Sequence, residues 1–258
     1  MKHIVQILII ILLLIIIGYY FYKFLKTEKF VATNSFTNVI FLSKEDTKRF
    51  IIDDPDFYVR SLSPLDLYAR KAKLEEDYRY NSSNSALDFT DEQKSRFSSA
   101  AKKADDYFKN SKFTAIDCTK IVQIPWKIAL TEGEVYENGL PHTRGDIIFI
   151  SSALNETEQT LVTTLIHEKV HLYQRANPNE MMSYLENQGF LRWKQRLGEP
   201  RIRANPDLDA WIYINSKTKK PMAAYYVSDQ PHNITDVTLT DAAYEHPYEL
   251  MAYRIANG

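Results

Sequence analysis

This sequence has few cysteines and glycines, and it has no excess of either charge. Its 258 residues include a single cysteine, Cys118, which excludes an intrachain disulfide framework and a cysteine-based zinc finger. Seven glycines exclude collagen-like and glycine-rich chains. Lysine and arginine number 32 against 33 acidic residues, so the net charge is −1 and no nucleic-acid partner is expected. Hydrophobic residues make up 45% of the chain, which is enough for a folded core and excludes wholesale disorder.

A long apolar run stands near the N-terminus. Residues 4–22 carry no charge, and Gln6 is their one strongly polar side chain. A helix of this length spans about 28 Å, close to the thickness of the bilayer hydrocarbon. Aromatic residues and then Lys23 and Lys26 follow, as at a membrane interface. We expect a transmembrane anchor over residues 1–26, inserted in the lipid bilayer through residues 4–22, and a tether over 27–38.

A cleaved signal peptide is the alternative interpretation of this run. It is less favoured, because its apolar part is shorter and ends in small residues at a cleavage site. Lysines are more numerous after the run than before it, which by the positive-inside rule favours a cytoplasmic C-terminal domain. The expected protein is therefore a single-pass membrane protein.

The remaining residues, 39–258, are expected to form one α+β domain, mainly helical over 39–110 and catalytic over 111–258. Helix-capping residues, hydrophobic periods and turn residues define its elements. In chain order, we expect helices over 43–80 with a break at 54–55, a loop at 81–86, a helix over 90–110, strands at 121–130 and 146–151, a helix over 156–175, a hairpin of 211–214 with 223–227, and a helix over 247–256. Pro125 suggests that the first of these strands is bent or lies at a sheet edge.

His167-Glu168-Lys169-Val170-His171 forms an H-E-x-x-H motif within the helix expected over 156–175. Two histidines four residues apart project from one helix face, so that both imidazoles can bind one zinc ion. Glu168 lies on the flank of that face, where a carboxylate can act as a general base without occupying a ligand position. The motif therefore predicts a zinc site.

The surrounding helix supports this interpretation. Its polar residues fall on the same narrow stripe as the two histidines, and its apolar residues cover the opposite arc. The polar stripe consists of Thr160, Thr163, Thr164, His167, His171 and Gln174. Lys169 falls within the apolar arc, and we expect its stem to reach solvent. Asn155 is the expected N-cap, with Glu158 as its capping-box partner.

A catalytic zinc needs a third protein ligand, and the best candidate is Glu249. Pro247 fits the first turn of a helix, and the small Ala252 would let that helix pack closely against the one with the two histidines. Glu245 and His246 are rivals in the same stretch.

On these residues the sequence resembles the zincin metallopeptidases of the gluzincin type. The motif at 167–171 and the P-Y-E-x-x-A element at 247–252 carry the resemblance, and the form ending at Gln174 is similar to poorly characterised peptidase-like proteins, including some from large DNA viruses. It implies a zincin-like domain, with the helix of the motif beside a small sheet. Against familiar gluzincins, the N-E-x-x-S-D signature is missing.

The resemblance implies hydrolysis of a peptide or protein substrate by a zinc-activated water, with Glu168 as general base. A further group should stabilise the oxyanion; His232 and Tyr253 are candidates, as are Tyr225, Tyr226 and Tyr248. The strand at 146–150 is expected to bind the substrate backbone.

Two other polar features are ambiguous. His142 lies in a turn and is more simply a solvated residue than part of a cleft. The segment 203–209 could orient a ligand or bind calcium, but a capped surface turn is the simpler interpretation.

The leading hypothesis is thus a membrane-anchored zinc metallopeptidase. Two alternatives remain open at this point: a non-catalytic membrane or virion protein with a structural or vestigial zinc site, and a zinc hydrolase of a non-peptide bond.

Overall fold

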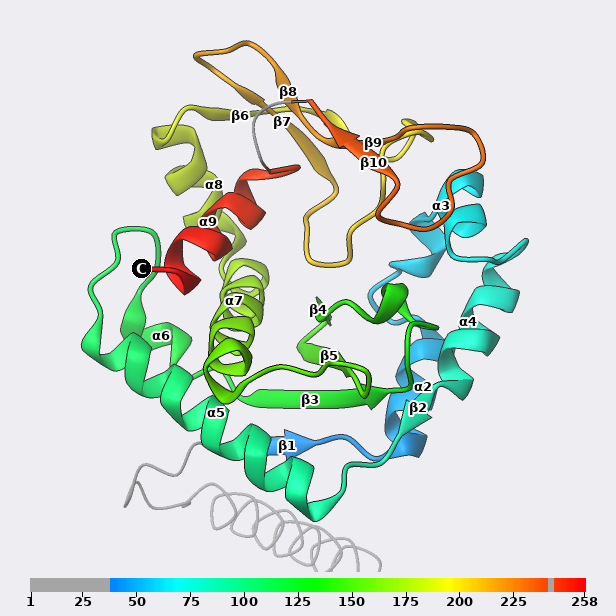
Figure 1. Ribbon diagram of the computed structural model, residues 1–258. Helices are drawn as coiled ribbons and strands as arrows, with labels where there is room; N and C mark the ends of the chain where they lie inside the picture. Colours follow the sequence, from blue (N-terminus) through cyan, green and yellow to red (C-terminus); the bar gives the residue numbers. More distant parts are fainter. Residues whose placement is uncertain (1–37, 241–243) are drawn as a thin grey trace, which may run out of the picture. The chain divides into compact units, whose positions relative to one another are not determined.

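A five-stranded sheet organises the first half of the domain in the computed structural model, which describes residues 38–240 and 244–258 (Figure 1). The described residues all belong to one unit. The membrane helix expected over residues 1–26 and the tether expected over 27–38 lie outside them, except for Asn38. No helix among the described residues is long and apolar enough to cross a bilayer.

The sheet has the strand order β1-β3-β5-β4, and β2 also pairs with β3. β1 (Val39–Phe41), β3 (Trp126–Thr131) and β5 (Ile147–Ser151) run parallel, whereas β2 (Ala86–Leu87) and β4 (His142–Arg144) are antiparallel to their neighbours. The expectation that Pro125 marks an edge strand is wrong. Pro125 comes just before β3, so the central strand loses no hydrogen bond to it.

Side chains alternate between two cores on either face of this sheet. Ile128, Leu130, Ile148 and Ile150 pack with α5 (Asp91–Asn110), α7 (Glu158–Ala176) and α9 (Pro247–Ala256). The intervening residues, such as Ala129 and Phe149, pack with the helices that precede α5. Burial on both faces explains why β3 and β5 are almost uniformly apolar.

The helices before α5 form the layer on the second face. They are α2 (Lys44–Asp53), the 3₁₀ helix η1 (Val59–Ser61), α3 (Pro64–Ala69) and α4 (Glu75–Asn84). The break expected at 54–55 is confirmed: Asp54 ends α2 with a φ of 49°. The loop expected at 81–86 is wrong, since α4 continues to Asn84 and β2 follows. Ser82 and Ser83 are buried against the neighbouring structure, so this polar stretch packs instead of looping out.

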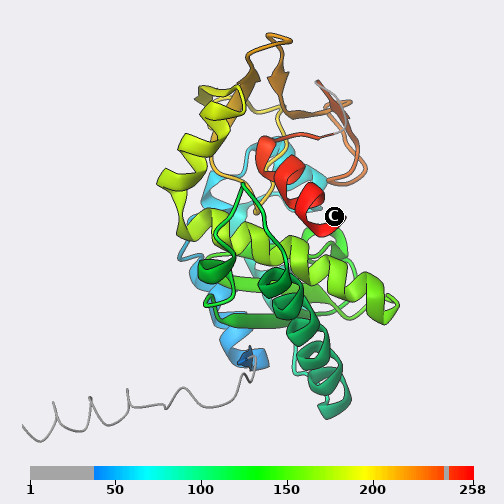
Figure 2. The same ribbon diagram turned by 90° about the vertical axis from the view of Figure 1, so that its left-hand side faces the viewer.

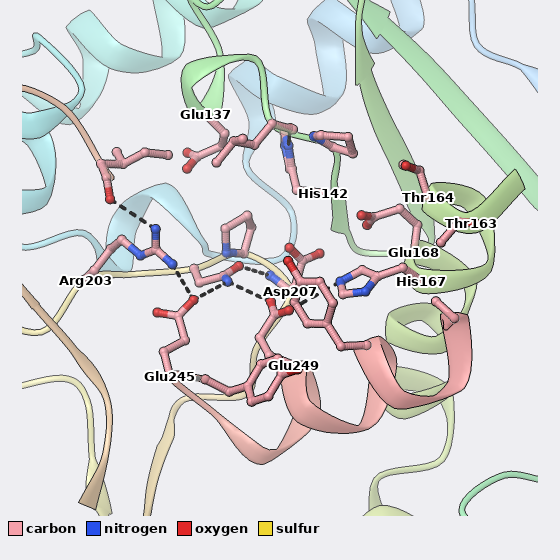
Figure 3. Close-up of a pocket in the computed structure, with 18 of the residues that line it drawn as sticks. Glu137, His142, Thr163, Thr164, His167, Glu168, Arg203, Asp207, Glu245 and Glu249 are labelled. Carbon is pink, nitrogen blue, oxygen red and sulfur yellow. Dashed lines mark hydrogen bonds and ion pairs between the residues drawn. The ribbon is translucent and has the colours of Figure 1, made fainter. Parts of the chain in front are cut away.

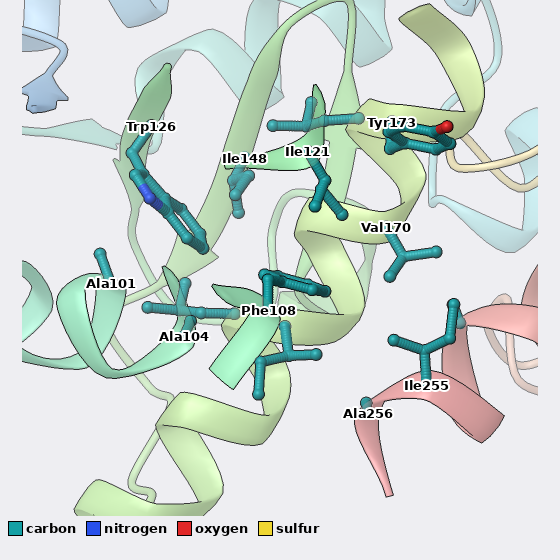
Figure 4. Close-up of a cluster of buried hydrophobic side chains, with 14 of the residues drawn as sticks. Ala101, Ala104, Phe108, Ile121, Trp126, Ile148, Val170, Tyr173, Ile255 and Ala256 are labelled. Atoms are coloured by element: carbon teal, nitrogen blue, oxygen red, sulfur yellow. The ribbon is translucent and has the colours of Figure 1, made fainter. Parts of the chain in front are cut away.

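α5, α7 and α9 lie side by side on the first face, where α9 (red in Figure 2) packs on α7. Ala100, Ala101 and Ala104 of α5 are fully buried, and these small residues leave room for the Trp126 side chain of β3 (Figure 4). The strand expected over 121–130 starts too early. The short helix α6 (Cys118–Ile121) ends at its first residue, and β3 begins only at Trp126. α7 is capped by Thr157, whose side chain accepts from the Thr160 amide, and not by Asn155 as expected.

The second half adds two small sheets. α8 (Pro178–Asn187) leads to β6 (Phe190–Gln195), which pairs with β7 (Trp211–Asn215), and β7 pairs with β8 (Pro221–Met222). β9 (Ala224–Tyr226) pairs with β10 (Val237–Leu239). The expected hairpin is therefore half right: the turn after β7 is present, but residues 224–226 join a different sheet. The chain is a mixed α+β fold, as expected.

Candidate metal centre

Two histidines of α7 face each other in the middle of the domain. His167 Nε2 and His171 Nε2 are 3.0 Å apart, and His171 is fully buried. Burial lowers the pKa of His171, against the pull of the Asp207 and Glu249 charges, and so favours the neutral imidazole that a metal requires.

The first turn of α9 brings Glu249 to the same point. Its Oε2 is 3.3 Å from His167 Nε2, and its Oε1 is 3.8 Å from His171 Nε2. Pro247 is in the first turn of the helix, and the His246 side chain caps the helix by accepting from the Tyr248 amide. Burial alone would raise the pKa of Glu249, but His171 and His167 outweigh it and lower the pKa to about 2.

These three side chains could hold one metal ion. One ligand atom from each lies within 4.8 Å of the others. Tetrahedral coordination with bonds of about 2.0–2.1 Å places ligand atoms roughly 3.3 Å apart, so the observed separations of 3.0, 3.3 and 3.8 Å fit without rearrangement. Of the two rivals for the third ligand, His246 instead caps α9, with its Nε2 3.3 Å from Asp209.

A second layer of hydrogen bonds orients these ligands. Gln174 lies 2.8 Å from His171 Nδ1 through its Oε1, and its Nε2 donates to the Tyr248 carbonyl. Asn205 Nδ2 donates to Glu249 Oε1 at 3.0 Å and to Glu245 Oε1 at 2.8 Å. Such partners fix the tautomer and direction of metal ligands. Segment 203–209 therefore orients Glu249, and its interpretation as a surface turn is wrong.

Glu168 is buried beside the two histidines, and its Oε2 has no hydrogen-bond partner in the described structure. Burial raises the pKa of this carboxyl well above its usual range, and the charges of Asp207 and Glu249 add to the effect. A buried acceptor without a partner is costly unless something bound nearby satisfies it. Glu168 lines the adjoining cavity, where a bound group could satisfy this carboxyl.

A cavity of about 440 Å³ adjoins this centre. Figure 3 shows His167 and Glu168 reaching it from α7 and Glu249 from α9, with His142 and Glu137 on another wall. Tyr253 also lines it, 46% exposed, with its ring edge-on to His167 at a centroid distance of 4.6 Å. Burial, reinforced by Glu249 and Glu168, raises the pKa of Tyr253, so its hydroxyl remains a donor at neutral pH.

Other candidate residues lie elsewhere. His232 is exposed and does not line the cavity; its carbonyl accepts from Lys71. Tyr226 is buried and donates to Asp66, and Tyr248 packs in the core beside His246. Tyr225 on β9 is also outside the cavity lining. Of the proposed oxyanion groups, the structure thus places only Tyr253 at the cavity.

Two expectations about the cavity wall are wrong. His142 is buried and stacks on Phe149 at 5.2 Å, because its turn leads directly into β4. The strand at 146–150 cannot accept a substrate strand, since β5 is paired on both sides. On this side the edge strand is β4, and there Asp207 already accepts the Thr143 amide.

Sequence reasoning missed two residues of the cavity lining and one buried ion pair. Glu137 and Glu156 line the cavity, although neither belongs to a motif. Lys169 does not reach solvent: it is fully buried, 3.1 Å from Asp105 and over the Trp126 ring. A charged residue inside an otherwise apolar helix arc was the one available sign of a buried ion pair.

Comparison with protein-family models, curated proteins and solved structures finds no match for this chain. The geometry of the centre alone therefore supports the functional interpretation.

Proposed function

We propose that the protein is a zinc-dependent peptidase with a zincin-like domain, held at a membrane by residues 4–22. The observation that carries this is the meeting of His167, His171 and Glu249 from two helices at ligand spacing, with Glu168 beside them. Two imidazoles and one carboxylate are a donor set typical of catalytic zinc.

The cavity supports a catalytic zinc over a structural one. Structural sites are closed by four protein ligands, whereas catalytic sites keep a position open. Among the described residues, the group that could hold a metal has three members and borders the cavity. The non-catalytic alternative has no comparable observation in its favour.

A zinc ion here would supply Lewis-acid chemistry, lowering the pKa of a water and polarising a carbonyl. Its charge would also favour the ionised form of Glu168, opposite to the effect of burial. Glu168 then takes a proton from the attacking water and returns it to the leaving amine. Tyr253 lines the cavity, and its hydroxyl would donate to the developing oxyanion.

Metal analysis and a single substitution test this proposal. Purified protein, supplemented with zinc, should contain one zinc per chain and cleave a peptide library. Glu168→Gln should keep the zinc and lose hydrolysis, whereas Glu158→Gln, on the exposed first turn of α7, should keep both. Less than stoichiometric zinc, or full hydrolysis by Glu168→Gln, contradicts the proposal. Zinc binding without cleavage of any peptide favours a non-peptide bond or a structural site.

The membrane anchor is tested separately. The full chain should stay with membranes after alkaline extraction, and a chain starting at residue 30 should be released. Asn81, Asn155 and Asn233 are N-glycosylation sequons. A glycosidase-sensitive mass shift would contradict a cytoplasmic orientation of the domain.

A further inference from the structure

Acidic side chains outnumber basic ones on the wall of the cavity. Its lining contains one guanidinium, that of Arg203, against six acidic side chains. The acidic residues are Glu137, Glu156, Glu168, Asp207, Glu245 and Glu249.

Most of these charges are already balanced. Glu137 is paired with Arg70 at 2.7 Å, and Glu245 is paired with Arg203. Asp207 lies in the field of Arg175, whose guanidinium donates to the adjoining Pro206 carbonyl. Glu168 and Glu249 face the proposed dication. Glu156 is the carboxylate that remains.

Glu156 immediately precedes the Thr157 cap of α7. Its side chain lies alongside the helix and reaches Thr164. Both carboxylate oxygens accept from Thr164 Oγ1, at 3.0 and 3.1 Å. Arg96 donates to the Glu156 backbone carbonyl and not to its carboxylate. Within the described part of the chain, no basic side chain forms an ion pair with this carboxylate. A half-buried anion at the cavity thus lacks a cation.

Its contact with Thr164 places the Glu156 carboxylate close enough to the centre for a neighbouring substrate residue. Thr164 precedes His167 by three residues, a rise of about 4.5 Å along the helix. Successive residues of an extended peptide are about 3.3 Å apart. A long side chain on a residue flanking the scissile bond can therefore reach Glu156.

A second acceptor points to a donating ligand independently. His142 is 97% buried (3% exposed) and lines the cavity. Its Nδ1 lies 2.9 Å from the Leu140 carbonyl, which can only accept, so Nδ1 carries the proton. Burial lowers the pKa of this ring and keeps it neutral. Its Nε2 is then an acceptor, and it has no partner among the described residues.

We propose that this cavity selects peptides with a lysine or arginine within two residues of the scissile bond, and that Glu156 binds the cationic group. This rests on the proposed peptidase function. A cation supplies the charge and the hydrogen-bond donors that the wall lacks. An aliphatic side chain shields the carboxylate from water and leaves it only the Thr164 hydroxyl as a partner, and an acidic side chain is repelled.

Two peptides that differ only in lysine against norleucine test the preference with the zinc-loaded full chain. Norleucine keeps the four-carbon stem of the lysine side chain and removes its ammonium group. A charge-assisted hydrogen bond is worth about 1.5–3 kcal/mol, so kcat/KM should favour lysine by at least about tenfold. Glu156→Gln should reduce this ratio toward one. Glu158→Gln, two residues away and paired with Lys103 outside the cavity, should leave the ratio unchanged.

The outcomes separate the two proposals. Cleavage of both peptides with equal kcat/KM, or a ratio that Glu156→Gln leaves unchanged, overturns the preference and leaves the peptidase intact. If neither peptide nor any member of the peptide library is cleaved, the peptidase proposal fails. Calorimetric binding of the same peptides to zinc-loaded Glu168→Gln then decides the preference by itself: tighter binding of the lysine peptide supports it, and equal or absent binding overturns it.

Discussion

Gln174 follows His171 by about one turn of α7, and its Oε1 atom lies 2.8 Å from His171 Nδ1. The same amide donates through Nε2 to the Tyr248 carbonyl on α9. Because an amide oxygen only accepts, this contact places the His171 proton on Nδ1 and leaves Nε2 free as a ligand. One side chain thus sets the tautomer of a candidate ligand and ties together the two helices that form the centre.

Gln174→Met is therefore expected to weaken zinc binding. Methionine has a similar size but neither hydrogen bond, and loss of such a partner typically lowers metal affinity by about 10–100-fold. Competition with a chromophoric chelator measures the affinity. Gln159→Met, on the exposed first turn of α7, is the matched control and should bind zinc as the original chain does. Equal affinities of the two variants would show that Gln174 does not act on the metal site.

Periodicity and spacing predicted the parts of the centre that lie within single helices. The polar stripe of α7 predicted the shared face of His167 and His171, and Pro247 with Ala252 predicted a helix that brings Glu249 toward them. These features depend on residues a few positions apart, where helix geometry alone determines which side chains meet.

The rest depends on partners far away in the chain. Asn205 contacts Glu249 across 44 residues, and Lys169 meets Asp105 across 64. No local pattern distinguishes a polar loop that lies on the surface from one that crosses a cavity. For the same reason the sequence favoured the wrong strand for the substrate: β5 is interior only because β4 folds back beside it.

The Tyr253 hydroxyl is the candidate oxyanion donor that the structure places at the cavity. If it acts in this way, Tyr253→Phe should lower kcat by about 10²–10³-fold, with little change in KM and in zinc content. Steady-state kinetics on a cleaved peptide measure both parameters. Tyr244→Phe is the control, since its ring packs on Tyr253 at 5.3 Å and lines the same cavity. A decrease that is equal in the two variants would assign the oxyanion to another donor.

Lys169 is expected to stabilise the fold through its position behind the centre. Its ammonium is 3.1 Å from Asp105 and 3.9 Å from the centroid of the Trp126 ring, with no exposure. Lys169→Met removes the cation from a buried carboxylate, which typically costs about 3–5 kcal/mol of unfolding free energy. Urea denaturation measures the loss.

The Lys169→Met/Asp105→Asn double variant should recover much of that stability, because it removes the buried charge together with its partner and keeps an oxygen that can accept from the Trp126 indole, 3.1 Å from Asp105 Oδ1. Lys103→Met, which breaks the exposed pair with Glu158, should change stability little. A double variant no more stable than Lys169→Met would show that the packing of the lysine stem, and not charge compensation, matters at this position.

The buried pair of Arg70 and Glu137 predicts how stability depends on pH. Burial alone would raise the pKa of Glu137, but the charge and hydrogen bonds of Arg70 outweigh it and lower the pKa from 4.5 to about 2. A depressed pKa stabilises the folded state above the unfolded value, and that contribution disappears as pH falls toward 2. This decrease in pKa corresponds to a contribution on the order of 3 kcal/mol to the free energy of unfolding. Glu137→Gln should therefore be less stable than the original chain above pH 5, and the gap in urea denaturation should close between about pH 4.5 and 2. Glu134→Gln, at an exposed position nearby, should differ little in stability from the original chain at any pH. If the stability difference between Glu137→Gln and the original chain stayed constant with pH, its effect would come from lost hydrogen bonds and not from charge.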